Sequence, residues 1–181
     1  MPLKINIPGK EFFDPELNEF IETKSMTLVL EHSLLSISKW EAKWHKPYLS
    51  KEEKTKEEVL DYIRCMSINS DVDIAVIRSL DSKTINKIID YIKDPMTATT
   101  ITKENKKPSR EIITNELIYY WMTALNIPFD PCQKWHLNRL LMFIEVCALK
   151  NQPPKKMPKG EIHRRNAALN AKRRAKYHNT G

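Results

Sequence analysis

The sequence predicts a mainly α protein, a helical bundle with a small N-terminal β element and a basic C-terminal helical tail. Its 181 residues include only three glycines, whereas β-sandwiches and barrels need glycine in many tight turns. Apolar residues recur at helical spacing over most of the chain after residue 32, often behind a helix start signal. The positive charge is concentrated near the C-terminal end. At about 150 residues per domain, the length favours one main domain with an appendage.

Glycine spacing also excludes two classes of enzyme. Gly9, Gly160 and Gly181 stand too far apart to form a phosphate-binding loop, which needs several glycines within about six residues. P-loop enzymes and enzymes with a dinucleotide-binding fingerprint are therefore excluded. The three cysteines are odd in number and widely separated, so we expect reduced thiols without a disulfide.

Residues 1–31 are expected to form a small β element packed on the body. The segment Lys4–Phe13 alternates and is divided by the turn signal Pro8-Gly9, which predicts a short hairpin or two extended pieces. The β-prone run Thr27–Glu31 is expected to pair with them.

Residues 32–150 are expected to form the helical body. Thr55 followed by Glu58 has the pattern of a capping box, in which the two side chains satisfy N–H groups at the helix start. Residues 95–108 have no helical period and are interpreted as an exposed connection. The expected helices cover 33–44, the segment that Thr55 opens (with Val59, Leu60, Ile63 and Met66 on its inner side), 72–80, 85–92, 108–126 and 130–150.

The last two of these helices are the most apolar. The helix expected at 108–126 has a stripe that we expect to be buried, made of Ile113, Leu117, Tyr120, Trp121 and Ala124. The helix expected from Asp130 to about Lys150 is apolar almost all the way round, with Leu137, Leu140, Ile144 and Cys147 on one side and Met142, Val146 and Leu149 on the other. Either it is the central helix of a bundle, or its second face belongs to a partner.

Catalytic and metal-binding motifs have little support in the sequence. Cys132 and His136 are four apart on an expected helix and could face one metal ion, but two more ligands at a sensible spacing are lacking. A packed thiol and a hydrogen-bonded ring are the favoured alternative. The sequence has neither a recognisable pair of catalytic carboxylates nor a G-x-S-x-G turn. We therefore expect no cofactor, no metal and no enzymatic activity.

Aromatic and apolar side chains of the helices are the candidate partner contacts. Aromatic residues dominate the energetics of many protein interfaces, and the expected contacts are Trp40, Trp44, Trp135, Leu141 and Phe143. The alternative is that the tryptophans are core residues, which their position on apolar stripes favours. Trp40 and Trp44 are separated by polar residues and are the candidates for the rim of an interface.

Residues 151–181 are expected to form a linker and a basic helical tail. Glu161 is the only acidic residue there, and Ile162 and Leu169 are its only large aliphatic residues apart from a methionine, too few to bury a stripe. Cations in such a tail either neutralise nucleic-acid phosphates or dock on an acidic protein surface and maintain solubility. The nine cations are Lys155, Lys156, Lys159, Arg164, Arg165, Lys172, Arg173, Arg174 and Lys176.

Six segments in this order extend over most of the chain: Leu30–Trp44, Lys54–Ile63, Ile118–Met122, Gln133–Leu141, Pro153–Met157 and Arg165–Asn170. In the order and residue content of these segments, rather than in a catalytic signature, the sequence resembles the tail assembly chaperones of long-tailed, siphovirus-like bacteriophages.

This resemblance implies a non-enzymatic chaperone in the host cytoplasm that binds the hydrophobic tape measure protein and helps tail-tube subunits assemble around it. Such chaperones are implied to be absent from the finished virion, and the family often makes a longer product by ribosomal frameshifting. Possible partners are the tape measure protein, the tail-tube protein and a second copy of the chain. The alternatives are a nucleic-acid-binding accessory protein that acts through the basic tail, and a structural component of the virion neck or tail. No signal peptide or membrane span is expected, since no apolar run approaches about 18 residues.

Overall fold

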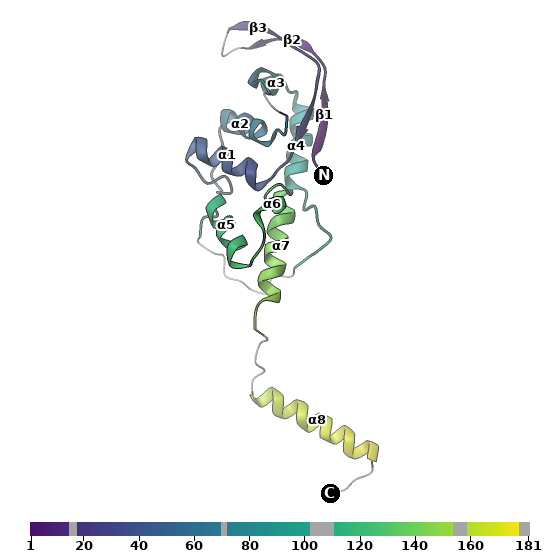
Figure 1. Ribbon diagram of the computed structural model, residues 1–181. Coiled ribbons are helices and arrows are strands. Elements are labelled where there is room, and N and C mark those ends of the chain that lie inside the picture. The colour runs from purple at the N-terminus through teal and green to yellow at the C-terminus, as the bar shows by residue number, and fades with distance from the viewer. Residues whose placement is uncertain (15–17, 70–71, 102–110, 154–158, 178–181) are drawn as a thin grey trace. The chain divides into compact units, whose positions relative to one another are not determined.

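The protein is mainly helical with a β element at its N-terminus (Figure 1). The computed structural model describes residues 1–14, 18–69, 72–101, 111–153 and 159–177. The chain divides into two compact units, Met1–Ala148 and Leu149–Gly181. None of the described helices is long and apolar enough to cross a lipid bilayer.

The N-terminal β element is one bent ribbon made of two antiparallel strand pairs. Its first strand pairs with its last, with Leu3 opposite Leu30, and the two inner strands pair with each other. Residues 4–13 therefore form two extended pieces and not a hairpin of their own, whereas the expected pairing of Thr27–Glu31 with the first piece is confirmed. The strands are β1 (Leu3–Ile7), β2 (Lys10–Asp14), β3 (Glu19–Thr23) and β4 (Met26–Leu30).

The ribbon bends where Pro8-Gly9 faces the connection between β3 and β4. A Cβ atom on Gly9 would lie 2.8 Å from the carbonyl oxygen of Thr23 and 3.0 Å from the amide nitrogen of Ser25. Both neighbours are backbone atoms, so a side chain at this position has no room. The turn signal in the sequence thus marks a close approach of two strands.

The first four helices begin at side-chain caps, of which the sequence indicates the one at Thr55. The helix expected at 72–80 is shorter, Ile74–Arg78, and the one expected at 85–92 begins earlier, at Ser82. Ser33 and Thr55 accept hydrogen bonds from N–H groups of the first turns, and Thr55 with Glu58 forms the complete capping box. Aspartates cap the next two helices. The elements are α1 (Leu34–Trp44), α2 (Lys56–Met66), α3 (Ile74–Arg78) and α4 (Ser82–Lys93).

The next helix, α5 (Asn115–Ala124), begins later than expected. Thr114 is its N-cap, and residues 111–114 are not helical, while 108–110 lie outside the described residues. The carboxylate of Glu41 accepts hydrogen bonds from the backbone N–H of Asn115 at 2.8 Å and from its side-chain amide at 2.6 Å. This long-range anchor fixes where the helix starts and which face it buries.

The prediction of a single helix at 130–150 is wrong. The chain forms a short α6 (Phe129–Cys132) and then α7 (Leu137–Lys150), with non-helical backbone at Asp130. The N–H of Leu137 donates to the carbonyl oxygen of His32 at 2.7 Å. A tertiary contact therefore caps the start of α7 in place of the local start signal.

The hydrophobic core lies between the β1–β4 ribbon and the helices up to α7. One expected buried face is confirmed in part and another is rotated. On α2, Ile63 and Met66 are buried as expected, whereas Val59 and Leu60 are half-buried and Tyr62 is buried in addition. On α5, Tyr120 is 65% exposed, and the buried residues are Asn115, Ile118 and Met122.

The C-terminal unit contains one helix, α8 (Lys159–Tyr177), which has no buried residue. Its alanine-rich sequence has high helix propensity. It is a solvated helix, as its few large apolar residues predict.

Gly9→Ala should lower the free energy of unfolding by about 1–3 kcal/mol, because the added methyl forces the backbone of β3 and β4 apart. Denaturant unfolding of the full chain measures this. The matched control is Gly160→Ala on α8, where a Cβ meets nothing within 4 Å. Equal stability of the two variants would show that the bend tolerates a side chain.

Candidate partner-binding surface

An aromatic patch at the start of α7 is the exposed feature that best fits a partner contact. We call Trp135, Arg139 and Phe143 the α7 patch. The guanidinium carbon of Arg139 lies 4.6 Å from the centroid of the Trp135 ring, and the ring centroids of Trp135 and Phe143 are 5.8 Å apart. Phe143 is 38% exposed. The half-buried Trp135 ring and the exposed Phe143 ring form one apolar surface, and the Arg139 guanidinium is stacked on Trp135.

The structure brings the five expected contact residues together in two separate pairs, Trp135 with Phe143 on and before α7, and Trp40 with Trp44 on α1, whose ring centroids are 6.2 Å apart. Leu141 is half-buried, and at about 100° per residue it lies far round α7 from Phe143. The buried residues of α7 are Leu137, Leu140 and Ile144. Its second face is only partly covered, since Met142 and Val146 are half-buried and Leu149 is 38% exposed.

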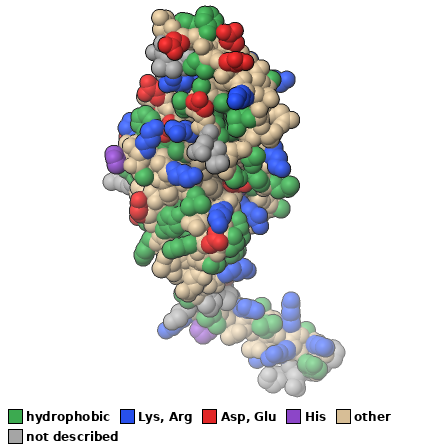
Figure 2. All heavy atoms as spheres, turned by 45° about the horizontal axis from the view of Figure 1, so that its top comes forward, with side chains coloured by type: hydrophobic (Ala, Val, Ile, Leu, Met, Phe, Trp, Pro, Cys, Tyr) green, Lys and Arg blue, Asp and Glu red, His purple; other side chains and the backbone are tan. Residues whose placement is uncertain are grey.

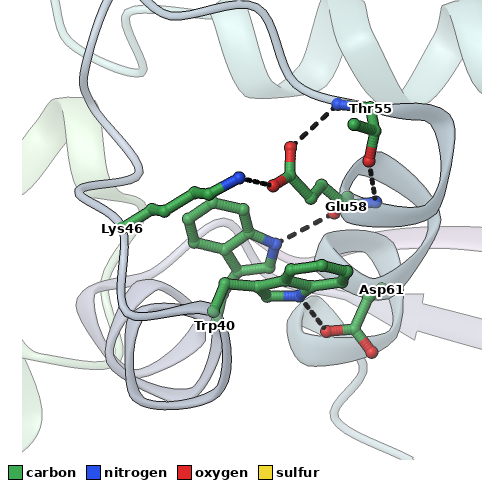
Figure 3. A network of polar contacts seen from close by, with 6 residues as sticks. Trp40, Lys46, Thr55, Glu58 and Asp61 are labelled. Carbon is green, nitrogen blue, oxygen red and sulfur yellow. Dashed lines mark hydrogen bonds and ion pairs between the residues drawn. The ribbon is translucent and has the colours of Figure 1, made fainter.

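Trp40 and Trp44 instead join α1 to α2. Trp40 is 1% exposed, and its indole N–H donates to the carbonyl oxygen of Glu58 at 2.9 Å. The indole N–H of Trp44 donates to the carboxylate of Asp61 at 2.8 Å. Figure 3 shows these contacts side by side. The prediction that Trp40 lies at the rim of an interface is therefore wrong. Its ring is in the core, as the alternative interpretation held.

Ion pairs reinforce the same contact between the helices. Lys46 Nζ lies 2.6 Å from the carboxylate of Glu58, whose other oxygen accepts from the N–H of Thr55 at 2.8 Å. The hydrogen bond from Lys46 lowers the pKa of Glu58 from its ordinary value. Lys43 Nζ lies 2.5 Å from Asp61. These carboxylates are engaged in structural contacts, as Figure 3 illustrates for Glu58 and Asp61.

A buried polar cluster lies where β4, α2, α4 and the start of α7 meet. His32 Nδ1 is 2.5 Å from the hydroxyl of Tyr62, and the Tyr91 hydroxyl donates to the carboxylate of Glu31 at 2.6 Å. His136 Nε2 is 3.0 Å from the carbonyl oxygen of Tyr91. The two imidazole rings are in edge contact, with centroids 5.1 Å apart.

The electrostatics of this cluster keep both histidines neutral at neutral pH. Burial, with a smaller contribution from the neighbouring His136, lowers the pKa of His32 to about 3. Burial is also the main cause of the lowered pKa of His136. Both side chains are at most 3% exposed. Both rings are thus enclosed in the core, and His136 Nδ1 is a buried atom without a hydrogen-bond partner among the described residues.

Cys132 and His136 do not share a helix, because the chain breaks between α6 and α7. Cys132 is a buried thiol, and His136 has the contact to Tyr91 described above. Within the described ranges, no group of three or more His, Cys, Asp and Glu side chains is arranged to hold a metal ion.

A cavity of about 220 Å³ lies between α2 and α4. Its walls are mainly apolar, and Lys54 and Lys93 are the only charged groups that line it. Its wall contains no carboxylate and no histidine, and the Tyr48 and Tyr62 rings contribute to it. It is suited to hold an apolar group.

The expected basic residues of α8 are all on the surface of that helix. Arg164, Arg165, Lys172, Arg173 and Arg174 are exposed. Lys155 and Lys156 lie outside the described residues.

Sequence reasoning missed an aromatic pair on the β2–β3 part of the ribbon. Phe13 and Phe20 are opposite each other in the strand register, with ring centroids 5.2 Å apart, and are 47% and 71% exposed. The alternation of the strand places Phe12 on the other face. This alternation is the signal that would have identified the pair, had the register been known.

Compared with known proteins, the chain matches no protein-family model, no curated protein and no solved structure. The surfaces described above are therefore the basis for inferring what the chain does.

The free energy of unfolding should fall as the pH is lowered from about 6.5 toward 3. In this window His32 binds a proton in the unfolded chain, where its pKa is ordinary, but not in the folded protein. At pH 5 the loss attributable to His32 is about 2 kcal/mol. Denaturant titrations at pH 7 and pH 5 measure it.

The matched comparison is His32→Gln against His163→Gln, since His163 is exposed on α8. His32→Gln should weaken the pH dependence of stability, and His163→Gln should leave it unchanged. A pH dependence that both variants share with the native chain contradicts the assignment to His32.

Proposed function

We propose that this chain is a non-enzymatic tail assembly chaperone of a long-tailed bacteriophage, which binds the tape measure protein and aids tail-tube assembly. The observation that carries the proposal is the exposed α7 patch, together with the engagement of the buried histidines and tyrosines in structural contacts. The resemblance of the sequence to this family supplies the identity of the client. In this proposal the protein acts in the host cytoplasm before the tail is complete.

The physical basis is that the exposed apolar surface of this chain can cover apolar surface of the tape measure protein. A long hydrophobic helical protein needs its apolar surface covered until the tube surrounds it. Trp135 and Phe143 offer apolar area, and the stacked Arg139 gives the patch a cation that remains in contact with water. The charged remainder of the surface keeps the complex in solution.

Phe143→Glu should weaken binding of the tape measure protein by at least tenfold, because it places a charge in the centre of the patch. The test titrates the full chain with a purified phage tape measure protein and measures the affinity. The matched control is Ile68→Glu, since Ile68 is a 59% exposed aliphatic residue just after α2. Equal binding by the native chain and both variants would contradict the proposed surface.

The second candidate function is nucleic-acid binding through α8. It is favoured by the absence of any buried residue on this helix and by the cations Arg164, Arg165, Lys172, Arg173 and Arg174. If about five of them contact phosphates, the logarithm of the binding constant should fall with a slope of about −4 to −5 against the logarithm of salt concentration. A tape-measure complex that persists in high salt, with DNA binding absent, favours the chaperone.

A structural role in the virion neck or tail is the remaining alternative. Mass spectrometry of purified virions separates it from the chaperone, which should be absent from them.

A further inference from the structure

The outward face of the β2–β3 ribbon combines two aromatic rings with two carboxylates. We call Glu11, Phe13, Phe20 and Glu22 the ribbon face. Glu11 is opposite Glu22 in the register, as Phe13 is opposite Phe20, and all four side chains are exposed. In Figure 2, acidic side chains are gathered with hydrophobic ones at the end of the body that carries β2 and β3.

This arrangement costs stability in the isolated chain. Like charges directly opposite each other across an antiparallel ladder repel, and neither carboxylate forms an ion pair with a described lysine or arginine. The adjacent Phe pair adds exposed apolar area. A ligand that combines cations with apolar side chains would relieve the repulsion and cover the rings.

One stripe of α8 has this combination. The residues Ile162, Leu169, Lys172 and Lys176 recur at spacings of three, four and seven, which places them on one side of a helix. Ile162 is 41% and Leu169 is 45% exposed. The stripe therefore offers two apolar side chains next to two ammonium groups, and none of it is covered.

We propose that α8 of a second copy of this chain docks on the ribbon face, so that the protein associates head to tail. Along the ribbon the carboxylate pair lies about 7 Å from the aromatic pair. Along α8, Lys172 and Lys176 lie about 4.5 and 10.5 Å from Leu169. With Leu169 over the rings of Phe13 and Phe20, the two ammonium groups lie on either side of the carboxylate pair.

Charge complementarity identifies the second copy as the occupant. α8 carries seven lysines and arginines against Glu161 alone, while the ribbon face carries two carboxylates and no cation. Each chain has one of each surface, so a second copy always supplies the complementary one. Contact between two different patches is heterologous, so it builds rings or open chains rather than a two-fold dimer.

Two charge-reversed variants of the full chain test the docking. The first is Lys172→Glu with Lys176→Glu, and the second is Glu11→Lys with Glu22→Lys. Sedimentation of nuclease-treated protein at low and high salt measures association. The native chain should associate with at least tenfold weaker affinity at high salt, and each variant alone should lose at least tenfold in affinity.

An equimolar mixture of the two variants should regain association, because each reversed helix then meets a reversed ribbon face. The matched control is Lys83→Glu with Lys87→Glu, two exposed lysines at the same spacing on α4, and it should associate like the native chain. Recovery in the mixture also shows that both variants are folded.

Three results would overturn the proposal. They are a native chain that stays at the monomer mass of 21.3 kDa, a single variant that associates as the native chain does, and a mixture that does not regain association. The first result would be expected if α8 docks within its own chain or on an unrelated partner. None of these results depends on the tape measure protein.

Discussion

The structure depends most on the short segment between β4 and α1. The N–H of Glu31 donates to the carbonyl oxygen of Met66 at the end of α2, and the carbonyl oxygen of His32 accepts the N–H of Leu137 at the start of α7. The side chain of Glu31 accepts the hydroxyl of Tyr91 from α4. Glu31 and His32 thus connect the ribbon to α2, α4 and α7. Their buried polar groups are stable because they have these hydrogen-bond partners.

The packing around this segment also determines which surfaces are left exposed to binding partners. His32, His136 and Tyr62 are enclosed in the core, and Glu58 and Asp61 are ion-paired between α1 and α2. The surfaces that remain for recognition are the α7 patch, the ribbon face and α8. They differ in chemistry, because the first is aromatic with a cation, the second aromatic with carboxylates and the third basic. The proposal that the protein acts by binding rests on these three surfaces.

Local signals in the sequence predicted the elements whose ends are set locally, as at Thr55, where the cap and its glutamate partner are three residues apart. They failed where a distant residue sets the end. α7 starts at Leu137 because the carbonyl oxygen of His32 accepts the N–H of that residue. α5 buries another face than expected because the carboxylate of Glu41 accepts the hydrogen bonds of Asn115. For the candidate surface, aromatic content identified Trp135 and Phe143, but it could not separate them from Trp40, whose burial depends on packing between α1 and α2.

The central claim is that the exposed face of α7 carries the recognition of an apolar client. Hydrogen–deuterium exchange of the full chain, with and without the tape measure protein, tests it most directly. The account predicts that added client slows amide exchange in α7, near Arg139 and Phe143, and leaves the exchange of α2 unchanged. Slower exchange confined to α8, or no change anywhere in a demonstrated complex, would contradict it.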